Sequence, residues 1–176
     1  MIYLLVGANK GQKIPKFLKS YGSIVYAIEA CPDNVRFLKA DYGNDPRVII
    51  IPKAAWVYEG EIVLKLYKSS LSHSLYDRGP KYIREEGEQK VTVPCMDFSA
   101  FLKDMRVDFM RMNIEGAECE VLLKCLKEGT LDNVERMEVD IHAHKIPSLE
   151  GLEKELRSEL AKWDPNGGRY KLWGKA

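Results

Sequence analysis

The chain has 176 residues, of which 27 are basic and 26 are acidic, so its formal charge is only +1. This length suits one domain with a single sizeable core. The even balance of charge excludes the basic surface of a protein that follows a nucleic-acid backbone. Every apolar run falls well short of the ~20 residues of a membrane span, and the apolar N-terminus is too short for a signal peptide. We therefore expect a cytoplasmic protein that binds neither nucleic acid nor membrane.

The cysteines support the same compartment. There are four, and none forms the paired C-x-x-C spacing of a zinc site or a redox couple: Cys31, Cys95, Cys119 and Cys125. Most lie in or beside apolar segments, which predicts buried, reduced thiols and a reducing environment.

Strand and helix patterns alternate from the start of the chain. The apolar run at residues 2–6 ends in glycine, as expected of a strand buried on both faces of a sheet. A helical face follows over residues 14–21 and stops at Gly22. Two further strands are expected at residues 24–28 and 48–51, separated by a helix over residues 35–42.

The middle of the chain has a different character. Residues 61–67 follow a Glu-Gly turn and alternate in part, which indicates an outer strand or a hairpin arm. Residues 68–90 are polar and lack a period, so we expect a long central loop that is functional or mobile. A strand at residues 91–95 and a short helix over residues 98–105 follow it.

The last third returns to alternation. Strands are expected at residues 107–114, 134–141 and 169–173, with helices over residues 121–126 and 149–163 between them. This order predicts an α/β fold with an open, mostly parallel sheet and helices on both faces, in a single domain of residues 1–176. Ligands of such sheets bind at the carboxyl ends of the strands, near the point where strand order reverses.

The loops that follow four parallel strands form the candidate site. They read Gly7-Ala8-Asn9-Lys10-Gly11, Glu29-Ala30-Cys31-Pro32, Lys53-Ala54-Ala55-Trp56 and Asn113-Ile114-Glu115-Gly116. Glu29 closes the second strand roughly 20 residues after the glycine turn, where a carboxylate accepts hydrogen bonds from both hydroxyls of a ribose. We therefore expect a ligand that contains a nucleoside.

The sequence of the glycine turn favours some nucleoside-containing ligands over others. It carries Asn9 at the middle glycine of G-x-G-x-x-G, where a pyrophosphate would press on the backbone, and it does not match G-x-x-x-x-G-K-[ST]. A nucleoside ligand without phosphate, such as S-adenosylmethionine, suits this turn better. A dinucleotide-dependent oxidoreductase is the less favoured alternative.

Three stretches, "VGANKGQ", "YAIEACPDNVRFLKA" and "VDFMRMNIEGAECEVLLKCL", closely resemble the FkbM family of S-adenosylmethionine-dependent methyltransferases. The stretch "VTVPCMDFSAFL" also fits, and the resemblance runs over residues 4–142. It implies a class I methyltransferase (Rossmann-like) fold and methylation of a hydroxyl on a sugar or other small metabolite. It also implies cofactor contacts from Gly7, Ala8, Asn9, Gly11, Glu29, Ala30, Ala54, Ala55, Trp56 and Asn113.

Two positions depart from the family pattern. The family usually has an acidic residue where this chain has Leu5, and aspartate where it has Asn113. Both carboxylates would lie toward the methionine end of the cofactor, so their loss removes favourable charge from a cationic ligand. A protein that binds the cofactor but is catalytically weak or inactive is therefore the main alternative.

Methyl transfer to a hydroxyl needs close in-line approach and a base if the hydroxyl is not acidic. The resemblance turns the loop after the fourth strand toward the methyl group, so Asn113 and Glu115 are catalytic candidates. Glu118 is as well explained as a carboxylate at a helix start. His73, in the long central loop, is a further candidate base.

The stretch "EVDIHAH" adds the third catalytic candidate, His142. Alternation along a strand places Glu138, Asp140 and His142 on one face. A divalent metal is conceivable there, since carboxylates suit magnesium, but we predict no metal ligand. The sequence identifies neither the methyl acceptor nor the oligomeric state.

Overall fold

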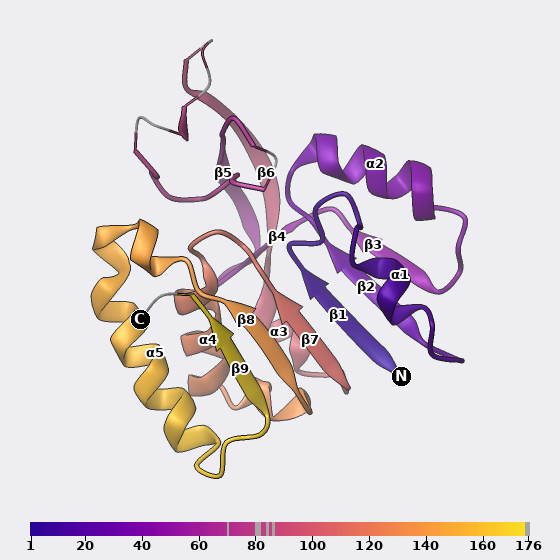
Figure 1. Ribbon diagram of the computed structural model, residues 1–176, viewed down its shortest axis with the longest axis vertical. Coiled ribbons are helices and arrows are strands. Elements are labelled where there is room, and N and C mark those ends of the chain that lie inside the picture. Colours follow the sequence, from indigo (N-terminus) through magenta and orange to yellow (C-terminus); the bar gives the residue numbers. More distant parts are fainter. Residues whose placement is uncertain (70, 80–81, 84, 86, 175–176) are drawn as a thin grey trace.

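The computed structural model describes residues 1–69, 71–79, 82–83, 85 and 87–174. A six-stranded sheet lies at its centre in the order β3-β2-β1-β7-β8-β9, and each neighbouring pair of strands is parallel (Figure 1). The strands are β1 (Ile2–Val6), β2 (Ile24–Ile28), β3 (Val48–Ile51), β7 (Phe109–Met112), β8 (Met137–Asp140) and β9 (Tyr170–Trp173). The predicted open, mostly parallel sheet is confirmed.

Helices cover both faces of this sheet, as expected. On one face lie α1 (Ile14–Phe17) and α2 (Pro32–Tyr42), and on the other α3 (Phe98–Leu102), α4 (Glu118–Lys127) and α5 (Glu150–Trp163) (Figure 1). Successive side chains of β1 point to opposite faces of the sheet. Leu4 therefore packs in the core on the α3–α5 side, and Tyr3 packs in the core on the α1–α2 side. Short 3₁₀ turns cover Thr130–Asn133, Ala143–Lys145 and Pro147–Leu149.

A second, smaller sheet stands between β3 and α3 in the chain. Its strands are β4 (Ala54–Trp56), β5 (Gly60–Leu66) and β6 (Gln89–Asp97), in the order β4-β6-β5. Strand β4 pairs in parallel with β6, and β5 pairs with β6 in antiparallel register. The outer strand expected at residues 61–67 is thus confirmed. Residues 54–56, expected as a loop, instead form β4, because they find a partner in Cys95–Asp97.

Some element ends differ from the expected ones. The first helix ends at Phe17 rather than near residue 21, and Tyr21 is fully exposed instead of packed. Strand β7 is shorter than the expected run over residues 107–114, and β8 is shorter than residues 134–141. Outside these shorter strands, Val107 and Val134 still meet in an isolated parallel bridge.

The four cysteines are buried free thiols, as expected. No helix within the described part of the chain is long and apolar enough to cross a membrane.

The topology fixes where a ligand can enter. From β1 the chain moves to β2 and β3 on one side, while β7, on the other side of β1, leads to β8 and β9. The order of strands therefore reverses between β1 and β7. In open parallel sheets the crevice for a ligand forms at such a point, beyond the carboxyl ends of the strands.

Candidate functional site

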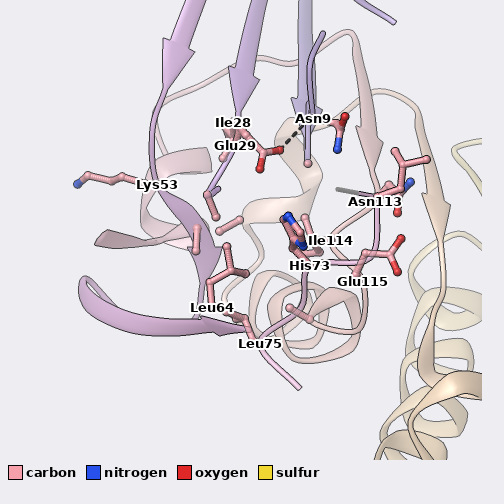
Figure 2. Close-up of a pocket in the computed structure, with 16 residues that line it drawn as sticks. Asn9, Ile28, Glu29, Lys53, Leu64, His73, Leu75, Asn113, Ile114 and Glu115 are labelled. Carbon is pink, nitrogen blue, oxygen red and sulfur yellow. Dashed lines mark hydrogen bonds between the residues drawn. The ribbon is translucent and has the colours of Figure 1, made fainter. Parts of the chain in front are cut away.

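A cleft lies at that point, between the carboxyl ends of the central strands and the second sheet (Figure 2). It holds about 630 Å³ of empty space, including a part that is open to solvent. Ends of β1, β2 and β7 and the loops after them supply most of its lining. The opposite wall comes from Leu64 of β5 and from Leu71, His73 and Leu75 of the segment after it.

The turn after β1 is fixed between its two neighbouring strands. Gly7 and Ala8 donate their N–H groups to the carbonyl of Ile28, at 3.0 and 2.9 Å. Gly7 has φ +81°, and a Cβ there would lie 1.9 Å from the carbonyl oxygen of Asn113. Asn9 has φ +52°, a conformation that glycine adopts more easily. The backbone of the turn is thus pressed against the end of β7 and also lines the cleft.

Glu29 closes β2 with its carboxylate on the cleft wall, as expected. Its oxygens accept hydrogen bonds from the N–H groups of Asn9 (2.8 Å) and Cys31 (2.9 Å) and from the Asn34 amide (3.3 Å). Burial raises the pKa of Glu29, and these hydrogen bonds oppose that shift. A carboxylate has about four acceptor positions, so the three bonds leave capacity for a ligand. Glu29 therefore shapes the turn and remains an acceptor.

Asn113 follows β7 and lines the same cleft. Its backbone N–H donates to the carbonyl of Val6 at 2.8 Å, which continues the pairing of β7 with β1. The side-chain oxygen Oδ1 is buried and has no hydrogen-bond partner among the described residues. A buried acceptor without a partner costs free energy. It is thus the natural contact for a hydrogen-bond donor on a ligand.

Glu115 lines the cleft, but two cations hold its carboxylate. It is ion-paired with Arg78, whose side chain is 2% exposed, and its Oε1 lies 3.1 Å from Nε2 of His142. These partners lower the pKa of Glu115 against the raising effect of burial. The residue also has φ +58°, and its carbonyl accepts a 2.6 Å hydrogen bond from the hydroxyl of Ser74. Glu115 thus ties the segment after β5 to the end of β7.

His142 lies behind Glu115 and is not among the residues that line the cleft. Its Nδ1 is 2.9 Å from Oε1 of Glu118, a fully buried carboxylate that also accepts N–H groups from Ile114 (3.0 Å) and Gly116 (2.9 Å). Burial disfavours the charged ring, but hydrogen bonds to Glu115 and Glu118 outweigh it and raise the pKa of His142 to about 9. At neutral pH the ring is an imidazolium held between two carboxylates.

His73 faces the cleft from the opposite wall, and Figure 2 shows its ring between Glu29 and Glu115. Its Nδ1 accepts a 3.1 Å hydrogen bond from the backbone N–H of Tyr67. A ring nitrogen that accepts a hydrogen bond carries no proton, so the proton of the neutral ring is on Nε2.

Three residues expected at the cofactor lie outside the lining of the cleft. Ala8 is packed in the core beside α1 and α2, and a Cβ on Gly11 would lie 2.6 Å from the ring of Tyr42 in α2. The ring of Trp56 packs against Tyr58 and Tyr76. Their contact with a cofactor stays a prediction. The expected residues that do line the cleft are Gly7, Asn9, Glu29, Ala30, Ala54, Ala55, Asn113 and Glu115.

Leu5, where the family pattern has an acidic residue, is buried in the core of this structure. It is 3% exposed among the apolar side chains beneath α1 and α2, on the face of the sheet away from Val6 and Ile28. Its side chain is not part of the cleft lining. The departure of Leu5 from the family pattern therefore places an apolar side chain in the core, and the effect of the missing charge on a cofactor stays a prediction.

The metal group conceived from "EVDIHAH" is not assembled. Arg111 of β7 pairs with both Glu138 (3.1 Å) and Asp140 of β8, while His142 turns to Glu115 and Glu118. The described residues contain no group of three His, Cys, Asp or Glu side chains able to hold a metal ion.

Sequence reasoning missed Arg78 and the part that Ser74 plays. Both belong to the central segment, whose lack of period gave no structural signal, and both act on Glu115, far away in the sequence. The structural role of Glu118 was visible only as a carboxylate at a helix start.

A sequence model of the family described as "Methyltransferase FkbM domain" matches residues 6–165. The chain therefore belongs to the FkbM methyltransferase family. A search of curated proteins found no match.

Two solved structures are similar to the chain. The crystal structure of methyltransferase FkbM from Methylobacillus flagellatus KT aligns with a TM-score of 0.54 and 13% identity, over 93% of this chain and 37% of that one. Yeast methylglyoxal/isovaleraldehyde reductase Gre2, complexed with NADPH, gives a TM-score of 0.48 and 11% identity, over 98% of this chain and 56% of that one. The first match supports the fold, and the second is too weak to bear on function. The chain thus spans just over a third of the first protein and little more than half of the second.

Proposed function

We propose that the chain is an S-adenosylmethionine-dependent methyltransferase that methylates a hydroxyl of a small molecule. The observation that carries this proposal is the pair of acceptors at the two sides of the cleft. They are the Glu29 carboxylate and Oδ1 of Asn113, which has no hydrogen-bond partner in the part of the chain that the structure describes. Figure 2 shows them on either side of Asn9. They suit two groups of hydrogen-bond donors on this cofactor, the ribose hydroxyls in its middle and the ammonium at its methionine end.

The residues between these acceptors fit the same ligand. Gly7 brings bare backbone to the cleft, and the small side chains of Ala30, Ala54 and Ala55 leave room on the wall. Asn9 fills the place where a dinucleotide needs a glycine for its pyrophosphate, so an NAD-dependent reaction has less support. S-adenosylmethionine would supply an activated methyl group beside Asn113 and Glu115.

Calorimetric titration tests the cofactor directly. We expect S-adenosylmethionine and S-adenosylhomocysteine to bind and NAD not to bind. Glu29→Ala removes charge-assisted hydrogen bonds of roughly 1.5–3 kcal/mol each, so S-adenosylhomocysteine should bind about tenfold more weakly or worse. Asp33→Ala, which removes an exposed carboxylate from the start of α2, is the matched control and should bind normally. NAD binding alone would refute the proposal.

A further inference from the structure

The turn after β7 begins at Asn113, the residue proposed to meet the ammonium of the cofactor, and its backbone has an unfavourable conformation. Glu115 has φ +58°, a left-handed value that residues other than glycine seldom adopt. A Cβ on the next residue, Gly116, would lie 2.4 Å from Cδ1 of Ile146, so the turn has little space on that side. A turn of this kind persists only where its surroundings hold it. The contacts of the turn therefore determine the position of Asn113.

The polar backbone groups of this turn have partners on two sides. Glu118, at the start of α4, accepts the N–H groups of Ile114 and Gly116 at 3.0 and 2.9 Å. From the other side, the hydroxyl of Ser74 donates a 2.6 Å hydrogen bond to the carbonyl oxygen of Glu115. Glu118 follows directly in the chain, whereas Ser74 belongs to the segment after β5. The Ser74 hydrogen bond thus joins the turn to a separate part of the fold.

Ser74 is itself held firmly in place. The residue is 1% exposed, and its backbone exchanges two hydrogen bonds with Lys65 of β5, at 2.9 and 3.1 Å. Its hydroxyl oxygen also accepts the N–H of Tyr76 at 3.1 Å. A hydroxyl has one proton to donate, and here that proton is directed to the carbonyl of Glu115. Ser74 is therefore a fixed donor against which the turn after β7 is positioned.

From these contacts we infer that Ser74 is a positioning residue, which holds the turn after β7 so that Oδ1 of Asn113 meets the ammonium of the cofactor. This inference rests on the proposed function and adds to it a residue that is not part of the cleft lining. The neighbours of Ser74 in the chain, His73 and Leu75, do line the cleft, so the same hydrogen bond holds the two walls together. A binding group acts at full strength only when its supporting contacts keep it close to the required geometry.

Calorimetric titration of the full chain with S-adenosylhomocysteine, which keeps the ammonium, tests the inference. We expect Ser74→Ala to bind about fivefold more weakly, as for the loss of one neutral hydrogen bond. Ser99→Ala is the matched control, because Ser99 is also 1% exposed and its hydroxyl lies 2.7 Å from that of Thr130, outside the cleft. It should lower the urea midpoint of unfolding about as much and leave binding unchanged. Should Ser74→Ala not fold, Ser74→Cys takes its place, since a thiol is a weaker donor of similar size.

Two further backgrounds identify the residue through which Ser74 acts. In Asn113→Ala the positioned contact is already lost, so adding Ser74→Ala should weaken binding by less than about twofold. In Glu29→Ala, which changes the other side of the cleft, adding Ser74→Ala should still weaken binding about fivefold. A general loosening of the fold would instead weaken binding equally in both backgrounds. Equal losses there, or wild-type affinity of Ser74→Ala, would overturn the inference.

Hydrogen exchange tests the contact without any ligand. The amides of Ile114 and Gly116 are bonded to Glu118 within the turn, and NMR can follow both. We expect them to exchange about fivefold faster or more in Ser74→Ala, and at the wild-type rate in Ser99→Ala. Unchanged exchange in Ser74→Ala would contradict the inference. A wild-type chain that does not bind S-adenosylhomocysteine would refute the proposed function, and the exchange rates would still show whether Ser74 holds the turn.

Discussion

Arg78 and Glu115 form an ion pair that joins the two walls of the cleft, although 37 positions separate them in the sequence. The Arg78 side chain is 2% exposed and that of Glu115 is 12% exposed. The guanidinium also donates to the carbonyl of Ser72 at 3.3 Å and lies over the ring of Tyr82. Loss of either charge would leave the other buried, so the pair fixes the position of the segment that carries His73 and Leu75.

We predict that Arg78→Met destabilises the fold by about 3 kcal/mol, because it leaves the buried Glu115 carboxylate without one of the two cations that hold it. Urea unfolding monitored by circular dichroism measures this change. Arg36→Met is the matched control, since Arg36 pairs with Asp33 on an exposed surface and should cost about 0.5 kcal/mol or less. Adding Glu115→Gln to Arg78→Met should recover part of the loss. Equal costs for Arg78→Met and Arg36→Met would mean that the buried pair contributes nothing.

His142 makes the stability of the fold depend on pH. Its pKa is raised from 6.5 to about 9, so the folded state binds a proton that the unfolded state releases. The stabilisation is complete below pH 6.5 and is lost as pH rises to about 9. It amounts to something on the order of 3 kcal/mol. Urea midpoints measured across this range should fall in the wild type and stay nearly level in His142→Gln. Parallel curves for the two proteins would contradict the assignment.

Gly7 should be required for the fold and not only for binding. A Cβ at Gly7 would lie 1.9 Å from the Asn113 carbonyl oxygen, whereas a Cβ at Gly22, with φ +69°, would meet nothing within 4 Å. Gly22→Ala therefore reports backbone strain alone, about 1 kcal/mol. Gly7→Ala should cost at least ~2 kcal/mol more, since β7 must shift. Thermal unfolding of both variants measures these losses of stability. Equal losses for the two variants would contradict the close contact between Gly7 and the end of β7.

Asn113→Asp restores a carboxylate at nearly constant size. Since Oδ1 is buried without a partner among the described residues, the new charge should attract a cationic ligand by on the order of 1 kcal/mol. Calorimetry should show S-adenosylmethionine binding several-fold more tightly, and S-adenosylhomocysteine, which lacks the sulfonium, gaining less. Equal gains for both ligands would place the carboxylate near the ammonium only. No gain for either would remove Asn113 from the cofactor site.

Local patterns predicted the parts of the site that depend on neighbouring residues. The apolar run of β1, the glycine turn and Glu29 were found because strand ends, glycines and spacing carry that information within about 30 residues. The burial of Leu5 beneath α1 and α2 was not predicted, although alternation along β1 turns its side chain to that face. The effect of its missing charge on a cofactor stays a prediction.

The contacts that the sequence did not predict are long-range. Ala54–Trp56 becomes a strand only because Cys95–Asp97 pairs with it, and nothing within the short segment signals that partner. Likewise, His142 is a buried imidazolium only because Glu115, in the loop after β7, and Glu118, at the start of α4, converge on it. The protonation state of a buried side chain depends on the charged groups that the tertiary fold brings to it, and not on spacing along the chain.

The segment between β5 and β6 begins and ends on paired residues, Leu66 and Gln89. Its two ends are therefore held side by side, and a change in its length costs little loop-closure entropy and leaves the parallel sheet undisturbed. This segment carries one wall of the cleft, while Glu29 and Asn113 belong to the ends of sheet strands. Insertions and deletions can therefore accumulate in this wall during divergence, so that homologues can reshape one side of the cleft and keep the side that carries Glu29 and Asn113.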